Sequence, residues 1–308
     1  MKLRWTSVAW SVVYLLLLLS LATPLAVVTV FFLLVPTVLL YSILSKRSFL
    51  LHIVPAWILA ALLCGPIILL QALYFIVPSI VMGELYKKRA PAFRTVMMGA
   101  GTILVEFLLV LLISTVMFNF NLSWAIEDMI NTAMDPFRNM ADSSLGSSIV
   151  WSQEMIQQFS SLTVRLLPFT LIVCSLAISA VTQAISRPTL GSMGLIVPKM
   201  PAFRNWRLPR SLIWYYLIAL LLELLGGAAI RQGFLGTIIL NLIPLLQFLF
   251  MIQAASLFFF IAYQRKWNPV FPVLLVIVMV FIPLLPLWLI GIADIAFPLR
   301  DMITKSKR

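Results

Sequence analysis

The chain has 308 residues, of which 62% are hydrophobic and only 10% are charged, and its formal net charge is +12. Soluble domains carry about 25% charged residues, so this composition excludes an ordinary soluble globular protein. Apolar stretches close to the roughly 20 residues needed to cross a bilayer recur along the whole length. Because the backbone must satisfy its own hydrogen bonds in lipid, we predict an all-α, polytopic transmembrane helix bundle.

Nine hydrophobic segments can be drawn, and we expect residues 1–308 to form a single integral-membrane domain. The start, "MKLRWTSVAWSVVYLLLLLSLATP", has the features of a signal peptide, but a second apolar stretch follows at once. We therefore expect an uncleaved first span. The segments cover residues 5–21, 25–44, 49–64, 66–84, 95–118, 164–186, 211–230, 234–263 and 269–297.

The last hydrophobic segment allows two interpretations because Pro283 and Pro286 lie near its middle. A single kinked span would leave the terminal basic residues on the outer side. A hairpin turning at the prolines would return them to the inner side, with arms only ~20 Å long at about 1.5 Å per residue. We favour the kinked span, which gives eight full spans and a proline-broken ninth, and the side of the C-terminus stays open.

The distribution of basic residues predicts the topology. If the N-terminus lies inside, fifteen basic residues face the cytoplasm, whereas the outer loops before the last segment hold three, Arg138, Arg165 and Arg231. The positive-inside rule therefore places the N-terminus on the cytoplasmic side of the membrane. The inner residues are Lys2, Arg4, Lys46, Arg47, Lys87, Lys88, Arg89, Arg94, Arg187, Lys199, Arg204, Arg207, Arg210, Arg265 and Lys266.

Two basic cytoplasmic loops, residues 85–94 and 187–210, share the tetrapeptide Pro-Ala-Phe-Arg. The flanking residues differ, so an internal duplication has little support. Neither loop is long enough to form an ordered nucleic-acid-binding module, and we expect no nucleic-acid partner. The basic charge is explained by topology and by contact with anionic lipid headgroups.

The outer loop, residues 119–163, is the one sizeable polar segment. Apolar Ile126, Ile130, Met134 and Phe137 recur at helical spacing, opposite three acidic residues. This pattern predicts an amphipathic helix over 122–140 that lies on the outer surface or caps the bundle. The stretch "IVWSQEMIQQFSS" suggests a second such helix, and the loop as a whole is either a structural lid or a gate. The acidic residues are Glu127, Asp128 and Asp135.

Two carboxyl groups are expected near the middle of the membrane. Glu106 and Glu223 each lie roughly 15–18 Å from the inner end of their segment, where a charge is costly and indicates a functional site. Tyr216 shares a helical face with Glu223. A protonated carboxyl that bonds another helix explains Glu106 and Glu223 equally well. Polar side chains of other spans could join them in a substrate-binding site, although helix packing explains most polar residues of this kind. These are Gln71, Gln183 and Asn241.

Enzyme motifs are missing. His52 is the only histidine, and neither a His-Glu-x-x-His zinc motif nor a phosphate-binding Gly-Lys-Ser/Thr loop occurs. Cys64 and Cys174 lie singly in apolar spans, so no metal site is predicted. We expect no catalytic activity and no cofactor.

Several stretches resemble the YybS-like family of bacterial multi-pass membrane proteins over essentially the full length. They are "LVPTVLLYSIL", "YFIVPSIVMGELYKKRAP", "FRNWRLPRSLIWYY" and "LIGIADIAFPLR". The family has been grouped distantly with the substrate-binding membrane subunits of energy-coupling-factor (ECF) transporters. The resemblance implies solute capture together with a separate coupling subunit. This chain departs from those subunits in having more than six spans. The nearest match to their small-residue contact, Ala22 and Ala26, lies in the outer turn.

These observations favour a transporter-like protein that binds a small solute near mid-membrane. The alternative is a membrane interaction or assembly protein without transport activity. The expected partners are the lipid bilayer and another membrane protein, either a coupling subunit or an assembly partner.

Overall fold

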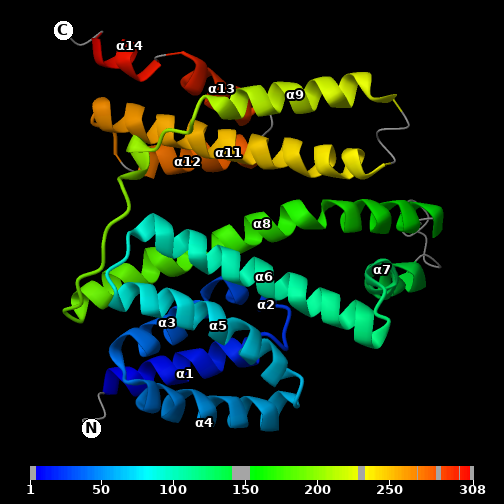
Figure 1. Ribbon diagram of the computed structural model, residues 1–308, viewed down its shortest axis with the longest axis vertical. Coiled ribbons are helices and arrows are strands. Elements are labelled where there is room, and N and C mark those ends of the chain that lie inside the picture. The colour runs from blue at the N-terminus through cyan, green and yellow to red at the C-terminus, as the bar shows by residue number, and fades with distance from the viewer. Residues whose placement is uncertain are drawn as a thin grey trace. The chain divides into compact units, whose positions relative to one another are not determined.

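The computed structural model describes residues 5–140, 153–227, 233–268, 270–281, 286–297 and 299–305. All regular structure within these ranges is helical, which confirms the predicted all-α fold. The helices, which are labelled in Figure 1, divide into two compact units. Unit 1 comprises Met1–Phe120 and Leu171–Met200, and unit 2 comprises Asn121–Thr170 and Pro201–Arg308.

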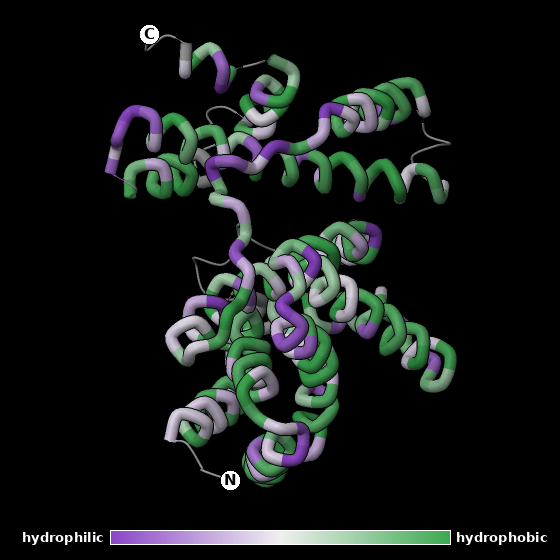
Figure 2. The backbone as a smooth tube through the Cα atoms, turned by 60° about the vertical axis from the view of Figure 1, so that its left-hand side comes forward, coloured by the Kyte–Doolittle hydropathy of each residue, from purple (hydrophilic) through white to green (hydrophobic). Residues whose placement is uncertain are grey.

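Six of the described helical stretches are long and apolar enough to cross a bilayer, and three shorter helices are also apolar. Each of them overlaps a hydrophobic segment expected from the sequence, and the last expected segment, residues 269–297, is divided between two short helices. Figure 2 shows hydrophobic residues along most of the helices and hydrophilic ones mainly at turns and helix ends. The long stretches are Ala26–Ile43, Lys46–Cys64, Ile68–Lys87, Ala92–Phe118, Glu154–Ser192 and Phe234–Gln264, and the short ones are Trp5–Ser20, Ser211–Leu225 and Leu287–Ala296.

Unit 1 is built around a short, enclosed helix, α3 (Leu34–Ile43), which buries every residue from Leu34 to Ser42. Around it pack apolar side chains of the neighbouring helices, with Tyr14 and Leu18 fully buried. Two polar contacts tie this core together: Trp57 Nε1 donates to the Tyr14 hydroxyl over 2.9 Å, and the Thr37 and Ser79 hydroxyls lie 2.6 Å apart. The other elements of unit 1 are α1 (Trp5–Ser20), α2 (Ala26–Thr29), η1 (Val30–Phe32), α4 (Lys46–Cys64), α5 (Ile68–Lys87), α6 (Ala92–Phe118) and the last part of α8 (Gln153–Ser192).

Glycines bring the helices of unit 1 close together. A Cβ on Gly83 of α5 would lie 2.6 Å from the Tyr41 ring of α3, and one on Gly99 of α6 would lie 2.5 Å from Ser179 Oγ of α8. Small residues let membrane helices approach closely enough for dispersion and interhelical hydrogen bonds to stabilise the contact. One such bond runs from Ser179 Oγ to the Val96 carbonyl over 2.8 Å.

Helix α8 is longer than we expected. It runs unbroken for 40 residues, about 60 Å at 1.5 Å per residue, so the described part of the proposed second amphipathic helix belongs to the same helix as the span at 164–186. By contrast, the amphipathic helix predicted over 122–140 is present as α7 (Leu122–Met140). Ile130 is buried and Asp128 is exposed, as expected, and Ser160 Oγ of α8 donates to the Ser123 carbonyl of α7. The side chains of Met134, Asp135 and Phe137 lie outside the described part.

Unit 2 is organised around α11 (Phe234–Gln264), which α9 (Ser211–Leu225), α12 (Val270–Phe281), α13 (Leu287–Ala296) and η2 (Phe203–Asn205) contact. The backbones of α11 and α13 touch, because a Cβ on Gly291 would overlap the Phe250 carbonyl. The ring of Tyr216 in α9 packs edge-to-face against Phe250 and at a tilt against Trp288. The last described helix is α14 (Leu299–Lys305).

The described helices of the C-terminal segment, α12 and α13, run in opposite directions as a hairpin, rather than as the single kinked span that we favoured. The residues between them, 282–285, lie outside the described part. Gly291 lies against Phe250, and Asp294, three residues further along α13, bonds Gln253, three residues further along α11. Helix α13 therefore runs parallel to α11. Since α12 starts just beyond the end of α11, it must run back along α11 before α13 returns. Neither arm reaches the ~30 Å of a hydrocarbon core, and Arg300 returns to the end of the bundle that holds Arg204.

Candidate functional site

A groove of about 680 Å³ lies between α5 and α6 in unit 1. Its walls are apolar apart from Tyr74, Gln71 and Glu106, the last two of which the sequence suggested as binding residues. The Tyr74 hydroxyl donates to the Ile103 carbonyl over 2.9 Å, which ties the two helices together beside the groove. The apolar lining residues are Leu70, Leu73, Phe75, Val77, Phe107, Leu109, Val110 and Ile113.

The periodicity of α6 places Glu106 in this groove. The buried positions Thr95, Val96, Gly99 and Ile103 form one face of the helix, and Glu106 continues that face three residues further on. It lies roughly half way along the helix, about 21 Å from Ala92 at 1.5 Å per residue. The side chain is half-buried, and Oε2 is enclosed without a hydrogen-bond partner among the described residues.

Gln183 of α8 also lies in unit 1 but is not among the residues that line the groove. The Tyr86 hydroxyl donates to Gln183 Oε1 over 2.5 Å, so the amide joins α5 to α8. Its Nε2 is buried and has no described partner. Gln183 therefore serves a helix contact.

In unit 2, Asn241 is inserted into the hydrogen bonding of a neighbouring helix. Its Oδ1 accepts from the Phe169 amide over 2.9 Å, and its Nδ2 donates to the Arg165 carbonyl over 2.7 Å. In an undistorted α-helix, the Phe169 amide would instead donate to the Arg165 carbonyl, four residues earlier. Asn241 thus joins α11 to the backbone of α8, and both of its polar side-chain atoms are engaged in hydrogen bonds.

Tyr216 and Glu223, both on α9, differ in their surroundings. Tyr216 is buried, and its hydroxyl accepts from Gln247 Nε2 over 3.0 Å. Glu223 is exposed on α9, although its position in the sequence suggested a site shared with side chains of other spans. Of the six suggested residues, the structure brings together only Gln71 and Glu106 around one described cavity.

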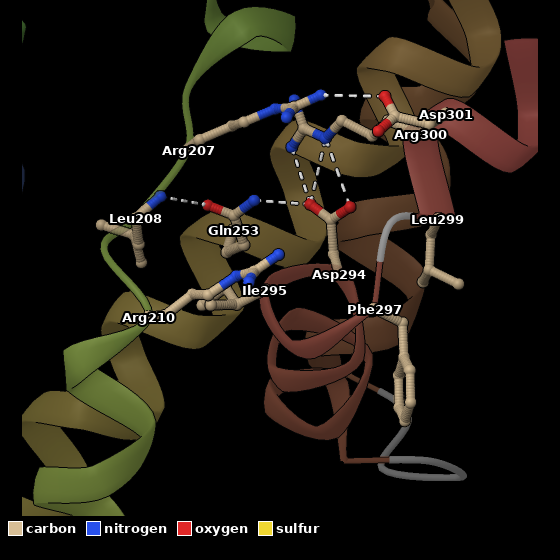
Figure 3. Close-up of a pocket in the computed structure, with 10 residues that line it drawn as sticks. All are labelled: Arg207, Leu208, Arg210, Gln253, Asp294, Ile295, Phe297, Leu299, Arg300 and Asp301. Atoms are coloured by element: carbon tan, nitrogen blue, oxygen red, sulfur yellow. Dashed lines mark hydrogen bonds and ion pairs between the residues drawn. The ribbon is translucent and has the colours of Figure 1, made fainter.

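A buried ionic cluster in unit 2 was not predicted from the sequence. Arg300 and Asp294, which are 4% and 9% exposed, form an ion pair with Nη2 2.8 Å from Oδ2 (Figure 3). Gln253 Nε2 donates to the same carboxylate, and Gln253 Oε1 accepts from the Leu208 amide over 2.9 Å. The carboxylate of Asp294 within the apolar helix α13 was a sequence signal for this site. Its partner Arg300 lies six residues further on, after α13 has ended.

The cluster fastens the segment before α9 to the C-terminal hairpin. Arg300 Nη1 donates to the Arg204 carbonyl over 2.7 Å, and Nη2 donates to Ser256 Oγ over 3.1 Å. Ser256 Oγ in turn lies 2.8 Å from the Phe203 carbonyl and 3.0 Å from that of Trp206. Every hydrogen-bonding side-chain group of the pair has a partner, so the arrangement stabilises the fold and leaves no reactive group.

Comparison with known proteins shows the family. The DUF2232 family of predicted membrane proteins matches residues 11–295. A protein of Bacillus subtilis (strain 168) named "Uncharacterized protein YybS" is 22% identical over 229 residues, which cover 73% of each chain. No solved structure matches. The match over most of the chain, together with its apolar helices, shows that the chain is a multi-pass membrane protein belonging to the DUF2232 family and similar to YybS.

Proposed function

We propose that this chain is a solute-binding protein of the bacterial cytoplasmic membrane, with its N-terminus inside. The groove between α5 and α6 takes a small apolar molecule whose head carries a positive charge or a hydrogen-bond donor. We expect the bound molecule to be held without any chemical change. As the resemblance to transporter subunits implies, a separate membrane protein would couple binding to movement across the membrane.

The observation that carries this proposal is the unpartnered Oε2 of Glu106 beside Gln71 in an apolar groove. A buried polar group without a hydrogen bond costs roughly 2–7 kcal/mol, and an unpaired charge costs more. Ionisable residues within membrane spans mark binding and transport sites for this reason. A cationic or donor head beside Glu106 would supply the missing partner.

The size and lining of the groove fit a small ligand. Small-molecule sites are clefts of about 300–1,000 Å³ with mostly apolar walls and a few polar groups that fix orientation, and this groove has a volume of about 680 Å³. Gln71 and Glu106 would orient the head, while the apolar walls would hold a hydrocarbon or aromatic body.

A second candidate function is assembly with a partner membrane helix. Gln183, Asn241 and Tyr216 all serve contacts between helices rather than a cavity. The outer walls of the groove, including Leu70 and Val110, are exposed and could also receive a helix.

Purification from native membranes distinguishes the two functions. We expect a small amphiphile to co-purify with the wild type, to be lost from Glu106→Gln, and to be retained by Glu223→Gln, which removes an exposed carboxyl from another apolar helix. Mass spectrometry identifies the bound molecules. A stoichiometric membrane protein in place of a small molecule, lost on substitution of Leu70 and Val110 by Ala, would support assembly and contradict solute binding.

A further inference from the structure

A small cavity of about 120 Å³ lies beside the buried ionic cluster of unit 2. Figure 3 shows Arg207 and Arg210 extending from the segment before α9 on one side, with Asp294, Arg300 and Asp301 on the other. Arg210 reaches toward Gln253 and Asp294, and Arg207 reaches toward Asp301.

The charges around this cavity do not balance. Asp294 is fully engaged by Arg300 and Gln253. Asp301 holds Arg207 only loosely, at 3.8 Å with both side chains more than 60% exposed, and such surface pairs contribute little. Arg210 has no ion-pair partner within the described ranges. One guanidinium is therefore unneutralised and a second is weakly held at the same opening.

The chemistry of these groups selects a phosphate. A guanidinium presents planar, paired donors that match the oxygens of phosphate, and its charge shortens and strengthens those bonds. Because a cavity needs roughly 10–15 Å³ to hold one water, a cavity of about 120 Å³ has room for a tetrahedral phosphate group.

The position in the fold suggests where the phosphate comes from. Arg210 directly precedes the apolar helix α9, so it lies where a membrane segment meets the headgroup layer. Basic pockets between membrane helices at this level bind the headgroups of anionic lipids. We propose that Arg207 and Arg210, backed by the Asp294–Arg300 pair, form a site for a phosphate group, supplied by an anionic phospholipid.

The site is independent of the proposed solute groove, because it lies in unit 2 and uses none of the groove residues. The loosely held Asp301 acts as its competitor: removing that carboxylate frees Arg207 for the phosphate. General electrostatic attraction to the membrane would not predict that this particular carboxylate opposes phosphate binding.

The test measures lipid binding by the full chain in detergent, using native mass spectrometry with dioleoylphosphatidylglycerol, and with dioleoylphosphatidylcholine as the zwitterionic comparison. We expect Arg210→Gln to weaken phosphatidylglycerol binding about fivefold or more, the effect of one arginine close to an anionic headgroup. Asp301→Asn should strengthen it. Arg265→Gln, which removes an exposed cation outside the cavity, should leave it unchanged.

Inorganic phosphate separates the two sources of the ligand. If inorganic phosphate binds and Arg210→Gln weakens that binding, whereas the lipid does not bind at this site, the site takes a soluble phosphate group. The proposed recognition of phosphate by arginine is then supported, and the lipid is excluded as its source. An equal loss in Arg265→Gln, or no loss in Arg210→Gln for either probe, would overturn the site. Thermal unfolding without ligand checks that Arg210→Gln is folded, as expected for an exposed side chain.

Discussion

Arg300 and Asp294 form a buried ion pair across the end of α13, and the same arginine reaches the Arg204 carbonyl about a hundred residues earlier in the chain. Breaking a buried pair leaves one charge uncompensated, which costs about 3–5 kcal/mol. We therefore expect Arg300→Gln to lower the free energy of unfolding by that amount, measured by denaturant titration in detergent.

The matched control for this pair is Arg207→Gln, which removes the exposed partner of Asp301 and should cost less than about 1 kcal/mol. The double variant Asp294→Asn with Arg300→Gln should recover part of the loss, since neither charge remains. Equal destabilisation by Arg300→Gln and Arg207→Gln would show that the buried pair does not fasten the hairpin.

Gly291 marks the closest approach of two helices in unit 2. Because an added Cβ would overlap the Phe250 carbonyl, which is backbone, Gly291→Ala must push α13 away from α11. Overpacking of this kind costs about 1–3 kcal/mol, measurable as a lower midpoint of thermal unfolding. Gly101→Ala is the control, since nothing lies within 4 Å of the Cβ it would add. A smaller loss in Gly291→Ala than in Gly101→Ala would contradict the close contact.

Asn241 should contribute to stability by joining α11 to α8. Asn241→Leu removes hydrogen bonds to the Arg165 carbonyl and the Phe169 amide, and interhelical bonds of this kind contribute about 0.6–1.7 kcal/mol. The variant should unfold at lower denaturant concentration but keep solute binding. Loss of binding with unchanged stability would assign Asn241 to a site instead.

The C-terminal hairpin predicts a sidedness that the single kinked span does not. In a variant without Cys64 and Cys174, Asn205→Cys and Thr304→Cys should both resist an impermeant thiol reagent in intact cells, because Arg300 binds the backbone beside Asn205. Asn121→Cys, which follows the end of α6 that the proposed topology places outside, should label. Labelling of Thr304→Cys but not Asn205→Cys would contradict the hairpin.

The helices were largely predictable because apolar runs of span length leave the chain few other folds in lipid. The amphipathic spacing around Ile130 likewise predicted α7, since a period near 3.6 residues fits only a helix. The direction of the C-terminal segment was not predictable, because Pro283 and Pro286 are compatible with a kink or a reversal. The close contact at Gly291 decides between them, and it lies between residues far apart in sequence.

The candidate site was only half predictable for the same reason. A polar residue in a span shows that a partner is needed but not which one, so Asn241 and Gln183 gave the same signal as Glu106. Their partners, the Arg165 carbonyl and the Tyr86 hydroxyl, are fixed by packing. The pairing of Asp294 with Arg300 was not predictable from the sequence, because it depends on how α13 and α14 are oriented toward each other.

The most direct test of solute binding at Glu106 is equilibrium binding of a decyl chain that carries different heads. Wild-type protein in detergent should bind decylamine more tightly than decanoate, because the Glu106 carboxyl attracts the cation and repels the anion. Glu106→Gln should abolish that preference, while Glu223→Gln should keep it. Equal binding of the two probes by the wild type, or a preference that survives in Glu106→Gln, would contradict the proposed function.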